Sequence, residues 1–95
     1  MNEDLNKKTY KYERMLREAL GKIKKSPNER SYLMRVADDF LNMADSYYRD
    51  GIYFLEKENI IDALASFSYG HAWLDAGMRL GIFKSKDEDY ELFTV

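Results

Sequence analysis

Apolar side chains recur at steps of three and four residues over the first quarter of the chain, a spacing that gathers them on one face of an α-helix. This face carries Leu5, Thr9, Tyr12, Leu16, Ala19 and Ile23. The opposite face carries mostly lysine and arginine side chains, which favours a solvated outer surface over a phosphate-binding one. The pattern predicts an amphipathic helix over about residues 3–25.

A second helix is predicted to begin at Pro27. Ser26 has the character of an N-cap, proline is favoured at the first helical position, and Glu29 completes a capping box. The apolar stripe that follows extends the helix over about residues 27–57. Its members are Leu33, Val36, Ala37, Phe40, Met43, Ala44, Tyr47, Gly51, Phe54 and Leu55.

The third predicted helix covers about residues 60–80, with Asn59 as its N-cap and Gly81 as the left-handed residue that ends it. Between Ile60 and Phe83 the only charged residues are Asp62, Asp75 and Arg79. A helix that is apolar around most of its circumference must be buried on more than one side.

These segments are joined by short connections, so consecutive helices should lie antiparallel. The predicted fold is all-α: one domain over residues 1–95, built as a three-helix up-and-down antiparallel bundle with a short C-terminal tail over residues 82–95. The tail ends on apolar residues, unlike most disordered termini. We expect Phe83, Leu92 and Phe93 to fold back over the bundle near Tyr69 and Trp73, or to dock onto another chain.

Small residues in the second and third helices indicate that their backbones approach closely, because glycine within a helix otherwise costs about 1 kcal/mol relative to alanine. Tyr47, Gly51, Phe54, Ala63, Phe67 and Gly70 have spacings similar to the hairpin of tetratricopeptide repeats. Only one such unit is present, so we interpret the pattern as the packing of a single helical hairpin rather than as a solenoid.

Composition narrows the function classes. The chain of 95 residues has no cysteine and one histidine, which excludes disulfides, thiolate chemistry and cysteine-based metal sites. We expect no metal and no cofactor. The longest stretch without a charged residue, 63–74, is shorter than the roughly 20 apolar residues that span a bilayer. With no secretory pattern at the acidic start, the prediction is a cytoplasmic protein without a membrane partner.

The charge of −2 is unevenly distributed. Residues 1–35 hold ten basic and five acidic residues, and residues 36–95 hold five basic and twelve acidic ones. Nucleic acid is nevertheless not favoured as a partner, because such domains usually have a pI above about 9 and this sequence has a pI of 5.4. The aromatic half of the chain is also the acidic half.

Several runs resemble a small archaeal family catalogued as domain of unknown function 357. They are residues 32–33 (YL), 37–41 (ADDFL), 43–48 (MADSYY), 63–77 (ALASFSYGHAWLDAG) and 92–95 (LFTV), with support from Tyr12, Met15 and Leu16. The resemblance implies a three-helix up-and-down bundle and a cytoplasmic archaeal setting. It implies no established activity.

His71 and Asp75, one helical turn apart, form a candidate polar centre with Ser68 and Tyr47. The favoured interpretation is a buried histidine whose hydrogen bonds are satisfied by a tyrosine such as Tyr47 or by a carboxylate. The alternatives are a ligand site or a base with its orienting carboxylate. A catalytic site would need further partners that the third helix does not supply, so an enzyme is not favoured.

The second candidate is an interaction surface on the outer side of the third helix and the tail. Its predicted members are Tyr69, Trp73, Leu80, Phe83, Leu92 and Phe93. Exposed aromatic patches are typical of interfaces, although the first helix or the tail could instead cover this face. The leading hypothesis is a protein-interaction or scaffold module that binds a protein partner or a second copy of itself. A homodimer would also offer the basic first helix an acidic surface. The alternative is a small-molecule-binding or hydrolytic bundle that uses His71 and Asp75.

Overall fold

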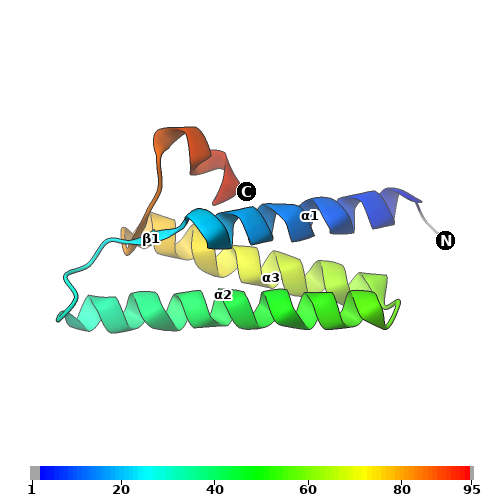
Figure 1. The fold of residues 1–95 in the computed structure, drawn as a ribbon, viewed down its shortest axis with the longest axis horizontal. Coiled ribbons are helices and arrows are strands. Elements are labelled where there is room, and N and C mark those ends of the chain that lie inside the picture. Colours follow the sequence, from blue (N-terminus) through cyan, green and yellow to red (C-terminus); the bar gives the residue numbers. More distant parts are fainter. Residues whose placement is uncertain (1–2, 95) are drawn as a thin grey trace.

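Three long helices run side by side and alternate in direction along the computed structural model, which describes residues 3–94 (Figure 1). The elements in chain order are α1 (Glu3–Lys22), β1 (Lys24–Lys25), α2 (Tyr32–Glu56), α3 (Ile60–Leu80), β2 (Phe83–Lys84) and the 3-10 helix η1 (Asp87–Leu92). The predicted all-α three-helix bundle is confirmed. Met1, Asn2 and Val95, which belong to the predicted domain and tail, lie outside the described residues.

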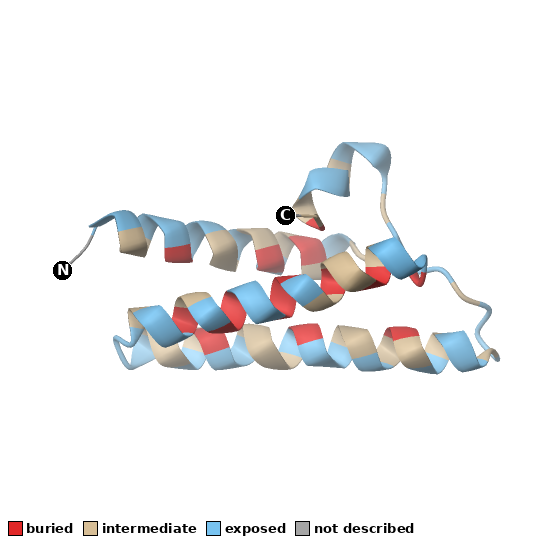
Figure 2. Ribbon diagram, turned by 180° about the vertical axis from the view of Figure 1, so that it is seen from behind, coloured by how far each residue is buried: buried red, intermediate tan, exposed pale blue. Residues whose placement is uncertain are grey.

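The core lies where the three helices face one another, and Figure 2 shows buried residues along these inner sides. The helices α2 and α3 form a tight hairpin, and α1 packs on it mainly through α3. Small residues make the hairpin close: α2 buries Ala37, Ala44 and Gly51 at intervals of seven residues. The ring of Phe67 occupies the space that a Cβ atom on Gly51 would need. The predicted close approach is therefore present.

Gly70 brings all three helices together. A Cβ atom added there would lie 2.8 Å from Cδ2 of Leu16 and 3.1 Å from the carbonyl oxygen of Ala44. Contacts this short would force a neighbour to move, so glycine at position 70 lets α3 approach both α1 and α2.

The ends of α3 are as predicted. The side chain of Asn59 accepts a hydrogen bond from the Asp62 amide at 3.4 Å, which caps the first turn. Gly81 follows the last turn with a φ of 80°, a left-handed conformation that glycine adopts without steric cost. The Ile82 amide donates to the carbonyl of Gly77 at 3.1 Å and completes the helix end.

The predicted boundary between the first two helices is wrong. The first helix ends at Lys22 instead of residue 25, because Lys24 and Lys25 are extended and pair antiparallel with Lys84 and Phe83. The amide of Ser26 continues this ladder by donating to the Ile82 carbonyl at 2.9 Å, and no helix begins at Pro27.

The second helix begins five residues later than predicted. Ser31 is its N-cap, with Oγ accepting from the Met34 amide at 3.2 Å. Residues 28–31 form a turn in which the Asn28 side chain accepts from the Arg30 amide. The local capping signal at Ser26 therefore does not start a helix, because this segment pairs as a strand with one more than fifty residues away.

The C-terminal tail folds back along α1, where Figure 1 shows it as the orange and red segment. The ion pair between Lys22 Nζ and Asp89 Oδ1, at 3.1 Å, links the end of α1 to η1. Phe83 lies on Gly77 of α3, and Phe93 is buried completely. The tail therefore covers the side of α3 that faces α1. The prediction that it lies near Tyr69 and Trp73, on the other side of this helix, is wrong.

Candidate functional site

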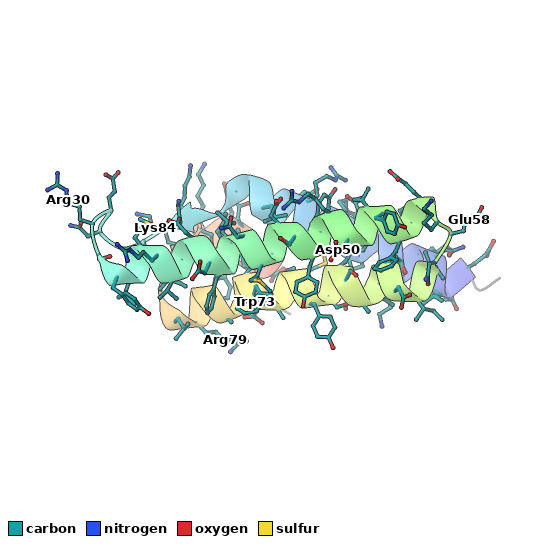
Figure 3. The ribbon with its side chains drawn as sticks, turned by 90° about the horizontal axis from the view of Figure 1, so that it is seen from below. Arg30, Asp50, Glu58, Trp73, Arg79 and Lys84 are labelled. Atoms are coloured by element: carbon teal, nitrogen blue, oxygen red, sulfur yellow. The ribbon has the colours of Figure 1, made fainter. Side chains whose placement is uncertain are left out.

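An apolar groove of about 260 Å³ lies between α2 and α3. Phe40 comes from α2, and Tyr69, Ala72, Trp73 and Ala76 come from α3. Figure 3 views this side of the molecule, with α2 and α3 in front of α1 and Trp73 at the boundary between them. Because α1 and the tail pack on the opposite side, no described element covers the groove.

Tyr69, Trp73 and Ala76 of the groove continue into Leu80, one turn beyond it, as a stripe along α3 at steps of four, three and four residues. Tyr69 is 62% exposed and Leu80 is 64% exposed. Trp73 is half-buried, because the ring of Phe40 meets it edge to face with centroids 4.9 Å apart. A tyrosine and a leucine exposed in one stripe beside a tryptophan form a larger apolar patch than scattered surface residues do.

The interaction-surface prediction needs a correction in the tail. Phe83 is 3% exposed and Phe93 is 0% exposed, so neither is available to a partner. Leu92 is half-buried, and its carbonyl group is engaged by His71. The apolar tail buries its own surface within the chain, which is the fold-back alternative of the prediction. Tyr69, Trp73 and Leu80 remain together on the open face.

The predicted polar centre is not assembled. His71 is 1% exposed, and its Nε2 atom donates to the carbonyl of Leu92, since a carbonyl oxygen can only accept. Within residues 3–94, the buried Nδ1 atom has no hydrogen-bond partner. The predicted bond to Tyr47 is absent there too, and the ring of Tyr47 instead packs on Tyr69 with centroids 5.6 Å apart.

The other members of that centre also have separate surroundings. Asp75 accepts a hydrogen bond from Arg79 Nε at 2.8 Å, one turn along α3. Ser68 is exposed. The structure therefore gives His71 no orienting carboxylate, and in the described part of the chain no group of three or more His, Asp or Glu side chains could hold a metal ion.

Sequence reasoning missed a polar network between α1 and α2. The Oε2 atom of Glu13 accepts from the hydroxyl of Tyr48 and from Nε of Arg17, each at 2.8 Å. Burial alone raises the pKa of Glu13, but the hydrogen bonds from Arg17 and Tyr48 outweigh it and hold this pKa below its usual value. Burial and the bond to Glu13 raise the pKa of Tyr48 to about 12. The i, i+4 spacing of Glu13 and Arg17 was visible in the sequence, whereas the contact with Tyr48 depends on helix packing.

The β1–β2 ribbon places lysines at one end of the bundle. Lys24 stands directly opposite Lys84 in the antiparallel pair. Lys25 makes an ion pair with Asp38 of α2 at 2.7 Å. The positive charge of the first 35 residues is thus partly paired with acidic residues of α2 and the tail.

Comparison with known proteins identifies the family. The model of the family described as "Protein of unknown function (DUF357)" matches residues 11–83. The chain belongs to the DUF357 family. This DUF357 protein is similar to protein AF1782 from Archaeoglobus fulgidus, whose crystal structure superposes with a TM-score of 0.72 at 24% identity. The similarity covers 88% of this chain and 96% of that chain, and at this identity it shows the shared fold alone.

A comparison with curated proteins gave no match. None of the helices that this DUF357 protein forms within residues 3–94 is long and apolar enough to cross a membrane. The family description gives no activity, so the function must be inferred from the surfaces of the molecule.

Proposed function

We propose that this DUF357 protein is a protein-interaction module whose docking surface is the groove between α2 and α3. The single observation that carries the proposal is the exposed apolar stripe of Tyr69, Trp73, Ala76 and Leu80 beside Phe40. The proposed occupant is an apolar α-helix of a protein partner. The proposal keeps the cytoplasm as the compartment, as predicted from the sequence.

The spacing of the stripe supports a helical occupant. Steps of four, three and four residues match the seam along which helices pack in left-handed bundles. A groove between two antiparallel helices also accepts a further helix readily. On the other side of the same hairpin, α1 is such a helix. Aromatic residues such as Trp73 and Tyr69 are frequent anchors of such interfaces.

The charge around the groove argues against a nucleic-acid partner. The two charged residues on this part of α3, Asp75 and Arg79, form an ion pair with each other. Proteins that stack bases on aromatic side chains combine them with a positive groove that follows the phosphates. The alternative of a small-molecule-binding or hydrolytic bundle gains no support either, because His71 is buried and Asp75 is paired elsewhere.

The test is native mass spectrometry of the tagged chain isolated from its own host, compared with Trp73→Glu. Tyr10→Glu is the matched control, since Tyr10 is an exposed aromatic residue of α1. The parent and the control should retain the same bound polypeptide, and Trp73→Glu should lose it while keeping the helical circular dichroism of the parent. Retention of the same polypeptide by Trp73→Glu would contradict the proposal, as would a parent that carries no second chain.

A further inference from the structure

We propose that the helix accepted by the groove is α3 of a second copy of the chain, lying antiparallel to the first α3 about a two-fold axis. The inference rests on the proposed function and names the partner of that docking surface. It depends on the charge of the stripe and on the order of large and small residues along it.

The charge of the stripe favours pairing with a second copy. A two-fold interface places the same surface patch of each copy against its counterpart, so a charged stripe would face its own charge. The stripe from Tyr69 to Leu80 carries no charge at its four seam positions. Asp75 and Arg79 lie beside it and neutralise each other at 2.8 Å. The stripe can therefore pair with itself without repulsion, and it offers no charge that would select a basic or an acidic partner helix.

The order of large and small residues along the stripe favours the antiparallel direction. An antiparallel arrangement that uses all four seam residues sets Trp73 against the partner's Ala76, and Tyr69 against the partner's Leu80. Each large ring then meets a smaller side chain, as close packing requires. A parallel arrangement in register would set Trp73 against the partner's Trp73 and Ala76 against the partner's Ala76. It would crowd one layer and leave the next one empty.

The neighbouring helix α2 adds to the same surface. Phe40 of α2 borders the same groove and holds Trp73 by its edge-to-face contact. Met43, one turn further along α2, is also exposed. Side chains of α2 thus widen the contact beyond the α3 stripe, and the two α2–α3 hairpins would form a four-helix layer with α1 on each outer side.

The oligomeric state of the purified chain is the first measurement. Sedimentation equilibrium at micromolar concentration should give a dimer for the parent and for Tyr10→Glu, and a monomer for Trp73→Glu. Ala76→Trp should also shift the equilibrium toward monomer, because it fills the place that receives the partner's Trp73 without adding charge. Dimers of unchanged affinity in both Trp73→Glu and Ala76→Trp would overturn the inference.

Cysteine cross-linking then tests the direction of pairing, because the natural chain contains no cysteine that could interfere. Positions 69 and 80 are separated by about 16 Å along one helix. In the antiparallel dimer, position 69 faces position 80 of the partner, while two copies of position 69 are too far apart for a disulfide, which needs Cα atoms within about 7 Å. A mixture of Tyr69→Cys and Leu80→Cys chains should form a disulfide-linked dimer, and neither variant should do so alone.

The outcomes separate this inference from the proposed function. A parent chain that is monomeric when purified, yet retains another polypeptide in its host through Trp73, overturns the self-pairing and leaves the docking surface in place. A dimer in which Tyr69→Cys chains cross-link with each other overturns the antiparallel arrangement. A dimer insensitive to Trp73→Glu, together with unchanged host partners, contradicts both.

Discussion

The ring of His71 donates a hydrogen bond from Nε2 to the main-chain carbonyl of Leu92, and this bond fastens the C-terminal tail to α3. Phe93, the next residue, is buried beside it in the core. The tail thus contributes Ile82, Phe83 and Phe93 to the core and leaves the opposite side of α3 free. His71 is buried, as the favoured interpretation of the sequence had it, but its partner is a main-chain carbonyl of the tail instead of a tyrosine or a carboxylate.

His71→Ala should destabilise the fold by about 2–4 kcal/mol, because it removes a buried ring and leaves the Leu92 carbonyl without its donor. Urea unfolding measures the loss, and hydrogen exchange should show faster exchange in η1. Ser68→Ala, at an exposed position on the same helix, should change stability by less than about 0.5 kcal/mol. A His71→Ala chain as stable as the parent, with unchanged exchange in η1, would show that the hydrogen bond from His71 to Leu92 does not stabilise the tail.

Gly51→Ala should destabilise the protein by about 1–3 kcal/mol, although the same change usually stabilises a helix. The added Cβ atom would overlap the ring of Phe67, which lies directly on Gly51. Gly21→Ala is the control, since a Cβ atom there meets nothing within 4 Å and should give a gain of about 0.5–1 kcal/mol. Thermal unfolding of the two variants should therefore shift the midpoint in opposite directions.

Acid should weaken the α1–α2 contact through Glu13. Its pKa in the folded protein is lowered, so its contribution to stability is present above the unfolded pKa of 4.5 and is lost as the pH falls through the folded value. Glu13→Gln should be less stable than the parent near neutral pH, and the difference should shrink as the pH falls below 4.5. Urea unfolding at a series of pH values measures this, and a difference that stays constant over the range would contradict the assignment.

Alkali should act on the same contact through Tyr48. Its pKa is raised to about 12 in the fold, so the folded state keeps this proton more tightly than the unfolded state. The stabilising contribution is complete below the ordinary tyrosine pKa of 10.0 and is lost as the pH rises from there toward 12. Ultraviolet difference titration should show one tyrosine ionising late, and Tyr48→Phe should remove that step. A titration unchanged by Tyr48→Phe would assign the late proton to another tyrosine.

Lys84→Glu should stabilise the β1–β2 ribbon by a few tenths of a kcal/mol, up to about 1, because it replaces a like-charge cross-strand pair with an opposite-charge pair to Lys24. The gain should diminish at high salt, where exposed charges are screened. Lys86→Glu, outside the paired register, is the control for the change in net charge. An equal gain in both variants would make the effect one of net charge alone.

Much of the bundle could be predicted because its signals are local. The apolar stripes, the Asn59 cap and the Gly81 helix end are each set by residues within one or two turns, and the structure has them where the sequence pattern places them. The start of α2 could not be predicted in this way. The capping box at Ser26 is a valid local signal, but the Ser26 amide is bonded to Ile82, which no pattern around Ser26 reveals.

The candidate interaction surface also has a part that could be predicted from local spacing and a part that could not. Tyr69, Trp73 and Leu80 share a helix face, so their common position on the open side of α3 follows from the spacing once α1 is known to pack elsewhere. Phe83 and Phe93 lie in the tail, where no periodicity determines direction, and the fold turns both toward the core. The contact of Tyr48 with Glu13 joins residues 35 positions apart, so it could not be predicted from the sequence pattern either.

By itself the sequence determined that the chain forms three helices, and that the third is apolar around most of its circumference, because hydrophobic periodicity is a property of neighbouring residues. The tertiary structure decided which side of that helix stays open. The tail could cover either side of this helix. The side that it covers depends on buried contacts such as Phe83 on Gly77 and on the hydrogen bond from His71 to the Leu92 carbonyl. Such contacts between distant segments exist only once the helices are packed, because their free energy comes from excluding water between surfaces that lie far apart in the sequence.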